Sequence, residues 1–307
     1  MKFLLIALFF FTVSGLFGEV QEKENLRQKL IKHGILAAQI SAKLNAELKV
    51  YGISGREILA AVRKNPAQFR VAVPEHTRKR LIIILPQHEK IISDSMIDEY
   101  RKNKKIYSDP AAEKKVHKVI TKLQKGSQYK LPARFFLISE AGINAYCLPD
   151  GSILVTRGAV TTLSEKQLAA VLAHEAGHAV ARHGAENITK MLVKSAAEVY
   201  ADHKMMESIT RKKNVQAALI KLGYGLGSQV GFLLPYSRKM EFEADKLGMI
   251  FLKRAGYDPK NMVDLLQFLE KSTPNSAWYE EYLSTHPLNP KRIKYVQTIL
   301  ETLKSDR

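Results

Sequence analysis

The stretch SEKQLAAVLAHEAGHAVARHG, residues 164–184, is the part of the chain around which the fold is organised. Ser164, with a glutamine three residues later, forms a capping-box pattern, and the apolar residues that follow recur at helical spacing. His174 and His178 lie one turn apart on this helix, so both imidazoles can reach one metal ion. Glu175 lies beside them and can take a proton from a water that the metal activates. The HExxH pattern therefore indicates metal-dependent hydrolysis.

A third protein ligand has to come from outside this pair. His183 lies nine residues after His174, about 180° round a continuous helix, so it faces away unless the helix breaks. We predict that His183 is a helix-end residue near the negative end of the helix dipole. Gly184 stands where the metzincin pattern requires a histidine, which excludes that class of protease.

The stretch YSRKMEFEAD, residues 236–245, offers better candidates. Glu241 and Asp245 are four residues apart and share one face of a helix. Glu243 is about 200° round the helix from Glu241 and must point elsewhere. One carboxylate of the pair can bind the metal while the other accepts the free N–H of a ligand histidine. The alternative for such a pair is a solvated helix face.

Four motifs in this order resemble the zinc metallopeptidases related to the CAAX prenyl protease, a family that includes HtpX, BepA, LoiP and the mitochondrial OMA proteases. The motifs are NAYCLPDGSILVTRG at 144–158, HEAGHAVARH, SRKMEFEAD about 60 residues later, and Thr285-His286-Pro287 with Arg292. Cys147 and Asp150 depart from the family pattern without touching a zinc ligand. The resemblance covers roughly residues 86–304.

This resemblance implies that His174, His178 and Glu241 bind one zinc ion per chain. It further implies that Glu175 is the general base and that Asp245 orients a ligand histidine. A gluzincin-like metallopeptidase domain is the fold that it implies, and an endopeptidase the activity.

Two residues near the end of the chain complete the predicted catalytic set. The resemblance implies that His286 approaches the zinc and can occupy its open position as an inhibitory gate. A capping or surface position is the alternative for a histidine before proline. Arg292 is assigned to a substrate carbonyl or to the developing oxyanion.

Three segments before the HExxH helix have strand character: 134–138, 144–148 and 153–156. We predict a small antiparallel sheet next to that helix. An edge strand beside the metal lets an extended peptide bind by backbone hydrogen bonds, and either of the last two segments can serve as this substrate ledge. A purely supporting role for the sheet is the alternative. The substrate-binding residues that we assign are Asn144, Ala145, Tyr146 and Cys147.

The fold class expected for the whole chain is α+β and mainly helical, with amphipathic helices at 87–100 and 110–124. Residues 1–18 have the pattern of a signal peptide, with one lysine before a long apolar run. Residues 19–85 form a predicted N-terminal helical extension, and residues 86–307 the metallopeptidase domain. The signal peptide predicts an exported, periplasmic protein.

The net charge of +18 favours anionic partners. Nucleic acid is not expected, because the chain has no recognisable nucleic-acid motif and carries an export signal. Peripheral contact with an anionic membrane surface fits better. From the family we expect unfolded or misassembled envelope proteins as substrates. The alternative function is that of a chaperone or assembly factor that binds clients and seldom cleaves them.

Overall fold

The computed structural model describes residues 82, 86–132, 134–190, 236–271, 285–286 and 290–305. The predicted signal peptide and, apart from Ile82, the N-terminal extension lie outside this set. The chain divides into two compact units, and nearly all described residues belong to the unit that holds 92–185 and 233–307. The domain boundary at residue 86 stays a prediction.

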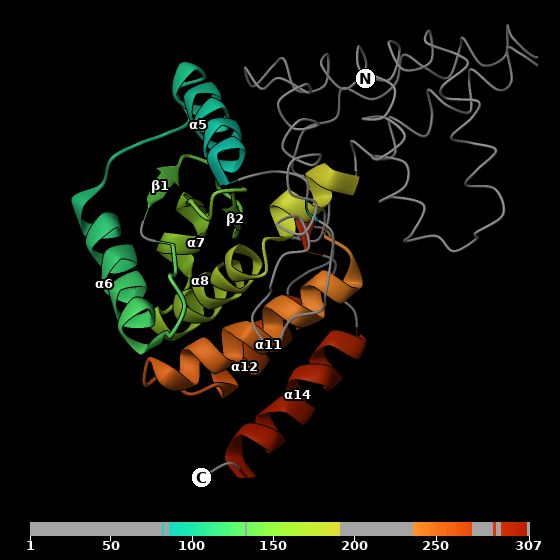
Figure 1. Cartoon of the computed structure of the whole chain (residues 1–307). Helices are drawn as coiled ribbons and strands as arrows, with labels where there is room; N and C mark the ends of the chain where they lie inside the picture. The colour runs from blue at the N-terminus through green and yellow to red at the C-terminus, as the bar shows by residue number, and fades with distance from the viewer. Residues whose placement is uncertain are drawn as a thin grey trace, which may run out of the picture. The chain divides into compact units, whose positions relative to one another are not determined.

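This unit is mainly helical with one small sheet, which confirms the α+β fold class (Figure 1). The strands are β1 (Phe135–Ile138), β2 (Ala145–Cys147) and β3 (Ile153–Thr156). The helices are α5 (Pro86–Lys102), α6 (Pro110–Gly126), α7 (Arg157–Thr162), α8 (Glu165–Val180), α11 (Arg238–Arg254), α12 (Lys260–Lys271) and α14 (Pro290–Ser305). The two predicted amphipathic helices correspond to α5 and α6.

The sheet has the strand order β1-β3-β2 and is mixed. β2 pairs antiparallel with β3, as expected for a hairpin, but β1 pairs parallel with β3 in the register Phe135 to Ile153. The prediction of a purely antiparallel sheet was therefore wrong for β1. The reason is topological: the hairpin folds back so that β3 lies between the other two strands, and β3 then runs in the same direction as β1.

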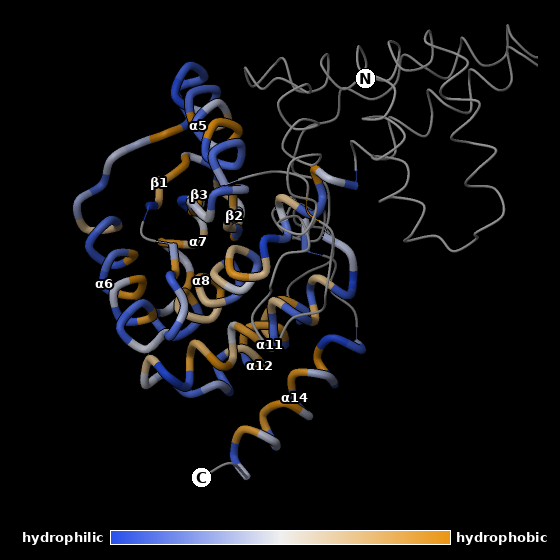
Figure 2. The backbone as a smooth tube through the Cα atoms, in the orientation of Figure 1, coloured by the Kyte–Doolittle hydropathy of each residue, from blue (hydrophilic) through white to orange (hydrophobic). Residues whose placement is uncertain are grey.

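Helix α8 forms the centre of the core. Its predicted capping box is present: Ser164 Oγ accepts from the amide of Gln167, and Gln167 Oε1 accepts from the amide of Ser164. Every residue from 168 to 178 is buried, because α8 is packed against α6, α11, α12 and β2. In Figure 2, hydrophobic and hydrophilic residues alternate along α6 and α14, as expected of helices that bury only one face.

Two glycines let α8 and α11 approach closely. A Cβ on Gly177 would lie 2.6 Å from the carbonyl oxygen of Ala244, and one on Gly248 would lie 3.1 Å from the backbone of Ala173. Each helix thus contributes one glycine to the contact with its neighbour. This close packing brings the histidine pair of α8 opposite the carboxylates of α11.

Candidate metal centre

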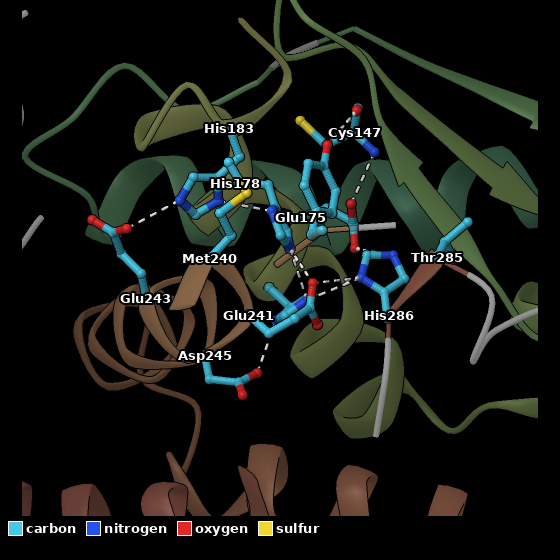
Figure 3. Close-up of polar contacts among 12 residues, drawn as sticks. Cys147, Glu175, His178, His183, Met240, Glu241, Glu243, Asp245, Thr285 and His286 are labelled. Atoms are coloured by element: carbon cyan, nitrogen blue, oxygen red, sulfur yellow. Dashed lines mark hydrogen bonds and ion pairs between the residues drawn. The ribbon is translucent and has the colours of Figure 1, made fainter. Parts of the chain in front are cut away.

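The two motifs predicted to share a metal meet across this contact. The ligand atoms of His174, His178, Glu241 and His286 all lie within 4.8 Å of one another, and all four residues are buried. The Nε2 atoms of His174 and His178 are 3.0 Å apart. Glu241 Oε1 lies 3.3 Å from His178 Nε2, and Glu241 Oε2 lies 3.5 Å from His174 Nε2. Figure 3 shows Glu241 pointing up from α11 toward this group.

These separations fit a tetrahedral metal site. Zinc–nitrogen bonds are about 2.0–2.1 Å long, so two ligands of a tetrahedral zinc ion lie about 3.3–3.4 Å apart. The three separations of 3.0, 3.3 and 3.5 Å lie around that value. Two imidazoles with one carboxylate are also a ligand set of catalytic zinc sites. The residues present therefore have the chemistry and the spacing to hold a metal ion.

Asp245 and Arg292 support one side of the cluster. Asp245 Oδ1 lies 2.9 Å from Nδ1 of His174, so it can hold the N–H on that nitrogen and leave Nε2 with its lone pair. Arg292, from α14, donates to Asp245 through Nε at 2.7 Å and through Nη2 at 2.9 Å. Its Nη1 lies 2.6 Å from Glu241 Oε2. The buried guanidinium thus ties both carboxylates of the predicted pair to α14.

His183 is placed differently from the sequence expectation. Helix α8 ends at Val180, Arg182 adopts a left-handed φ of 53°, and the chain is helical again from 183. The helix therefore breaks, and His183 turns back so that its Nδ1 lies 2.8 Å from Nδ1 of His178. The prediction that it faces away was wrong. His183 is not in the ligand cluster, but it is buried and contacts a member of it.

Glu243 does point away from Glu241, as its position on the helix requires, yet it is not a surface residue. Its Oε2 lies 3.1 Å from Nε2 of His183. The contact between these two residues was not predicted, because it depends on a helix break at Ala181 and Arg182, where the sequence has neither glycine nor proline. The repeated acidic residues at 241, 243 and 245 were the available signal.

Glu175 lies between the cluster and the sheet. Its Oε2 accepts a hydrogen bond of 2.8 Å from the amide of Cys147, and its Oε1 lies 3.5 Å from Nε2 of His286. The general base predicted from the sequence is therefore held by a backbone group of β2. Burial raises the pKa of Glu175 above its ordinary value.

The four predicted substrate-binding residues lie in or next to β2, an edge strand of the described sheet. β3 is paired on both sides, so of the two candidate ledges only β2 offers an edge. That edge is covered by side chains. The amide of Cys147 is bonded to Glu175, and the amide of Ala145 donates to Asn144 Oδ1 at 2.9 Å. Both amides thus have intramolecular partners in this structure.

Tyr236 covers the same edge and was not predicted to act in the site. Its hydroxyl donates to the carbonyl of Cys147 at 3.3 Å, and its ring stacks on His178 with centroids 3.9 Å apart. Burial raises its pKa well above the ordinary value, so the hydroxyl keeps its proton. A tyrosine just before a predicted helix start gives no sequence signal for this contact.

His286 occupies the fourth position of the cluster. Its Nδ1 lies 3.3 Å from Glu241 Oε1 and 3.4 Å from His174 Nε2. The structure therefore brings it to the predicted location beside the ligand atoms. Its action as a gate stays a prediction.

The surroundings of the cluster shift the pKa values of its members in different directions. Burial acts against the charge on His174, but hydrogen bonds with Asp245 and Glu241 raise its pKa to about 9. Burial lowers the pKa of His178 well below its ordinary value. Burial would raise the pKa of Glu241, but Arg292 and the histidines hold it well below its ordinary value. Glu241 is thus a carboxylate and His178 a neutral imidazole, the forms that bind metal.

Comparison with known proteins places this geometry in a family. The model of peptidase family M48 matches residues 110–300, more than half of the chain. The mitochondrial metalloendopeptidase OMA1 of Arabidopsis thaliana is 38% identical over 159 residues, which are 52% of this chain and 30% of that protein. OMA1 of Schizosaccharomyces pombe is 34% identical over 155 residues, 50% of this chain and 42% of that protein.

A bacterial relative is similar over a longer stretch. The beta-barrel assembly-enhancing protease of Escherichia coli is 27% identical over 205 residues, 66% of this chain and 42% of that protein. The chain thus spans less than half of the length of these relatives. The match to the family model runs from the start of α6 into α14 and includes every helix that contributes to the cluster. This chain therefore belongs to peptidase family M48, whose members named here are metalloendopeptidases and related proteases.

Proposed function

We propose that this chain is a zinc-dependent endopeptidase that hydrolyses peptide bonds in misfolded or stalled proteins of the cell envelope. The observation that carries the proposal is the convergence of two imidazoles and one carboxylate next to a buried glutamate, at the edge of a sheet. Membership of a peptidase family supports the reaction class.

Zinc is the metal that the donors favour. His174 and His178 would bind through Nε2 and Glu241 through its carboxylate, with one ion per chain. Magnesium and calcium prefer oxygen ligands, whereas two imidazoles with one carboxylate suit zinc. When bound, zinc lowers the pKa of a water and polarises a carbonyl group.

Glu175 is the group that we assign to hold and move the proton. Its raised pKa brings the carboxylate closer to the pH range in which a general base works well. It takes a proton from the attacking water and delivers it to the leaving amine. In the resting protein, the hydrogen bond from the amide of Cys147 holds this carboxylate in place.

Arg292 and Asp245 orient the ligands in this proposal. Three guanidinium nitrogens face Asp245 and Glu241, so the geometry supports a role in holding these carboxylates more than one in binding a substrate oxyanion. Removal of one partner from a buried, paired charge network costs about 3–5 kcal/mol. Arg292 therefore links the integrity of the metal centre to the fold.

The edge of β2 is our candidate substrate ledge, and His286 our candidate gate. An extended client would pair with the outward amide and carbonyl of Cys147 in place of Glu175 and Tyr236. His286 would leave the cluster to make room for a scissile carbonyl. In this proposal, the contacts that His286, Tyr236 and Glu175 make belong to the closed form of the site.

The envelope assignment rests on two supports. The apolar N-terminal run predicts export to the periplasm, and bacterial relatives are named for beta-barrel assembly. None of the helices in the described residues combines the length and apolarity needed to cross a membrane. The excess of positive charge supports peripheral contact with an anionic membrane surface, and we propose no nucleic-acid partner.

Two variants test the function directly. Glu175→Gln keeps the shape of the side chain and removes the base, so we expect unchanged zinc content and a loss of casein cleavage of about 10²–10⁴-fold. Glu241→Gln should lower the zinc content of the purified protein. Glu301→Gln, at an exposed position of α14, serves as a control that changes neither. Full zinc content in Glu241→Gln, or full activity in Glu175→Gln, would contradict the proposal.

A client-binding chaperone or assembly factor is the second candidate, and the covered state of the site favours it. His286 lies among the ligand atoms, and Tyr236 and Glu175 cover the ledge. A protein kept in this state would hold clients elsewhere and seldom cut them. Aggregation of an unfolded client should then be suppressed equally with and without a chelator, whereas a protease loses its effect when zinc is removed.

A further inference from the structure

A second chain of buried polar contacts leads away from the metal centre on the side opposite Asp245. It runs from His178 to His183 and on to Glu243 (Figure 3). The Nδ1 atoms of the two histidines are 2.8 Å apart, and His183 Nε2 lies 3.1 Å from Glu243 Oε2. All three residues are buried.

For a neutral His183, the carboxylate at the end of these contacts determines where the hydrogens lie. A carboxylate only accepts hydrogen bonds, so His183 donates its Nε2–H to Glu243. A neutral imidazole has one N–H, so Nδ1 of His183 carries a lone pair and accepts the Nδ1–H of His178. The Nε2 of His178 is then left with its lone pair, and this is the atom that faces Glu241 at 3.3 Å.

We propose that His183, held by Glu243, is a positioning residue that fixes the tautomer and ring orientation of His178 for metal binding. The inference rests on the proposed zinc site. His174 receives this support directly from Asp245, at 2.9 Å. His178 receives it through an intervening imidazole, so that both carboxylates come from α11 although the two histidines are one turn apart on α8.

The backbone is shaped for this contact. A non-glycine residue rarely adopts a positive φ, yet Arg182 does so directly before His183, at 53°. This left-handed residue ends α8 and turns the next side chain back toward the histidine pair. On the other helix, Glu243 lies between Glu241 and Asp245. Within five residues, α11 thus supplies the ligand Glu241 and the two carboxylates, Glu243 and Asp245, that support the histidines.

A core-filling role for His183 would make the same contacts, and two substitutions separate the alternatives. His183→Leu keeps a side chain of roughly similar size and removes both ring nitrogens, including the acceptor. His183→Asn places an amide oxygen where Nδ1 lies and can accept the His178 N–H again. Zinc affinity, measured by competition with a chelator, should fall about 10–100-fold in the leucine variant and be largely restored in the asparagine variant.

Controls separate metal affinity from stability and from the proposed function. Leu269→Ala opens a cavity in buried α12 and should lower the melting temperature without changing zinc affinity. Glu241→Gln should lose zinc whether or not His183 positions His178. If Glu241→Gln loses zinc while His183→Leu binds zinc as tightly as the wild type, the positioning role of His183 is overturned and the metal site stands. If Glu241→Gln keeps its zinc, the metal site itself is wrong.

The nitrogen NMR spectrum of the zinc-loaded protein provides an independent measurement. We expect the His178 ring to show a hydrogen on Nδ1, with a scalar connection or close contact to a hydrogen-free Nδ1 on His183. Glu243→Met leaves both rings in place, removes the acceptor and serves if His183→Leu does not fold; it should weaken zinc binding and perturb the Nδ1 signal. An unchanged affinity and spectrum in Glu243→Met, or a hydrogen on Nδ1 of His183 in the wild type, would refute the proposal.

Discussion

His286 Nδ1 lies 3.3 Å from Oε1 of Glu241, so a residue from near the end of the chain occupies the space where a substrate carbonyl would approach the ligand atoms. If His286 acts as a gate, its removal should raise the rate of casein cleavage several-fold. We expect this of His286→Ala with unchanged zinc content. His117→Ala, at an exposed position of α6, is the matched control and should have no effect. A fall in rate in His286→Ala would instead indicate that His286 takes part in the reaction.

The contact between Gly177 and Ala244 should be sensitive to a single methyl group. A Cβ at 177 would lie 2.6 Å from a backbone oxygen, so Gly177→Ala must push α8 away from α11. We expect a loss of about 1–3 kcal/mol in the free energy of unfolding, together with weaker zinc binding.

Gly248→Ala provides the comparison for this variant. There the nearest atom is the flexible end of Met262, and the backbone of Ala173 lies at 3.1 Å, so a smaller loss is expected. Denaturant unfolding of both variants measures the difference. Equal stability of the two variants would show that the α8–α11 spacing is not set at Gly177.

Tyr236→Phe tests whether the ledge is covered in the resting protein. Loss of the hydroxyl frees the carbonyl of Cys147 from its 3.3 Å hydrogen bond, while the ring can still stack on His178. A client no longer has to displace this bond, so KM for an unfolded substrate should fall with little change in kcat. A large drop in kcat would show that the hydroxyl acts on the reacting groups and not on access to the strand.

Metal binding should release a proton over a defined pH range. The pKa of His174 in the metal-free site is raised to about 9, so this imidazole is protonated at neutral pH. Zinc requires the lone pair of Nε2 and must displace that proton. Calorimetry in buffers of different ionisation enthalpy should therefore detect proton release at pH 7–8 that declines above pH 9. Binding without proton release at pH 7 would contradict the raised pKa.

Much of the metal centre was visible in the sequence because its motifs obey helical geometry. The spacing of His174 and His178 and the shared helix face of Glu241 and Asp245 follow from about 100° per residue. The choice of Glu241 as the ligand came from the family resemblance. The antiparallel pairing of β2 with β3 was also predictable from local sequence, because a short turn joins the two strands.

The features that were missed depend on tertiary structure or on one unusual backbone angle. Arg182, the residue with the left-handed φ, is not a glycine, so the sequence did not indicate that the helix ends before His183. The parallel pairing of β1 requires knowing which strand lies in the middle. The stacking of Tyr236 on His178 joins segments that are far apart in the chain.

The hydrogen bond between the amide of Cys147 and Glu175 has a further consequence for timing. A peptide that adds to the strand through this amide must take it from the very carboxylate that deprotonates water. Binding of the peptide and release of the general base would then occur in one step. A folded protein that cannot present an extended backbone would leave Glu175 hydrogen-bonded to the amide of Cys147. Selectivity for unfolded chains could thus arise from the backbone alone, without any pocket that reads side-chain identity.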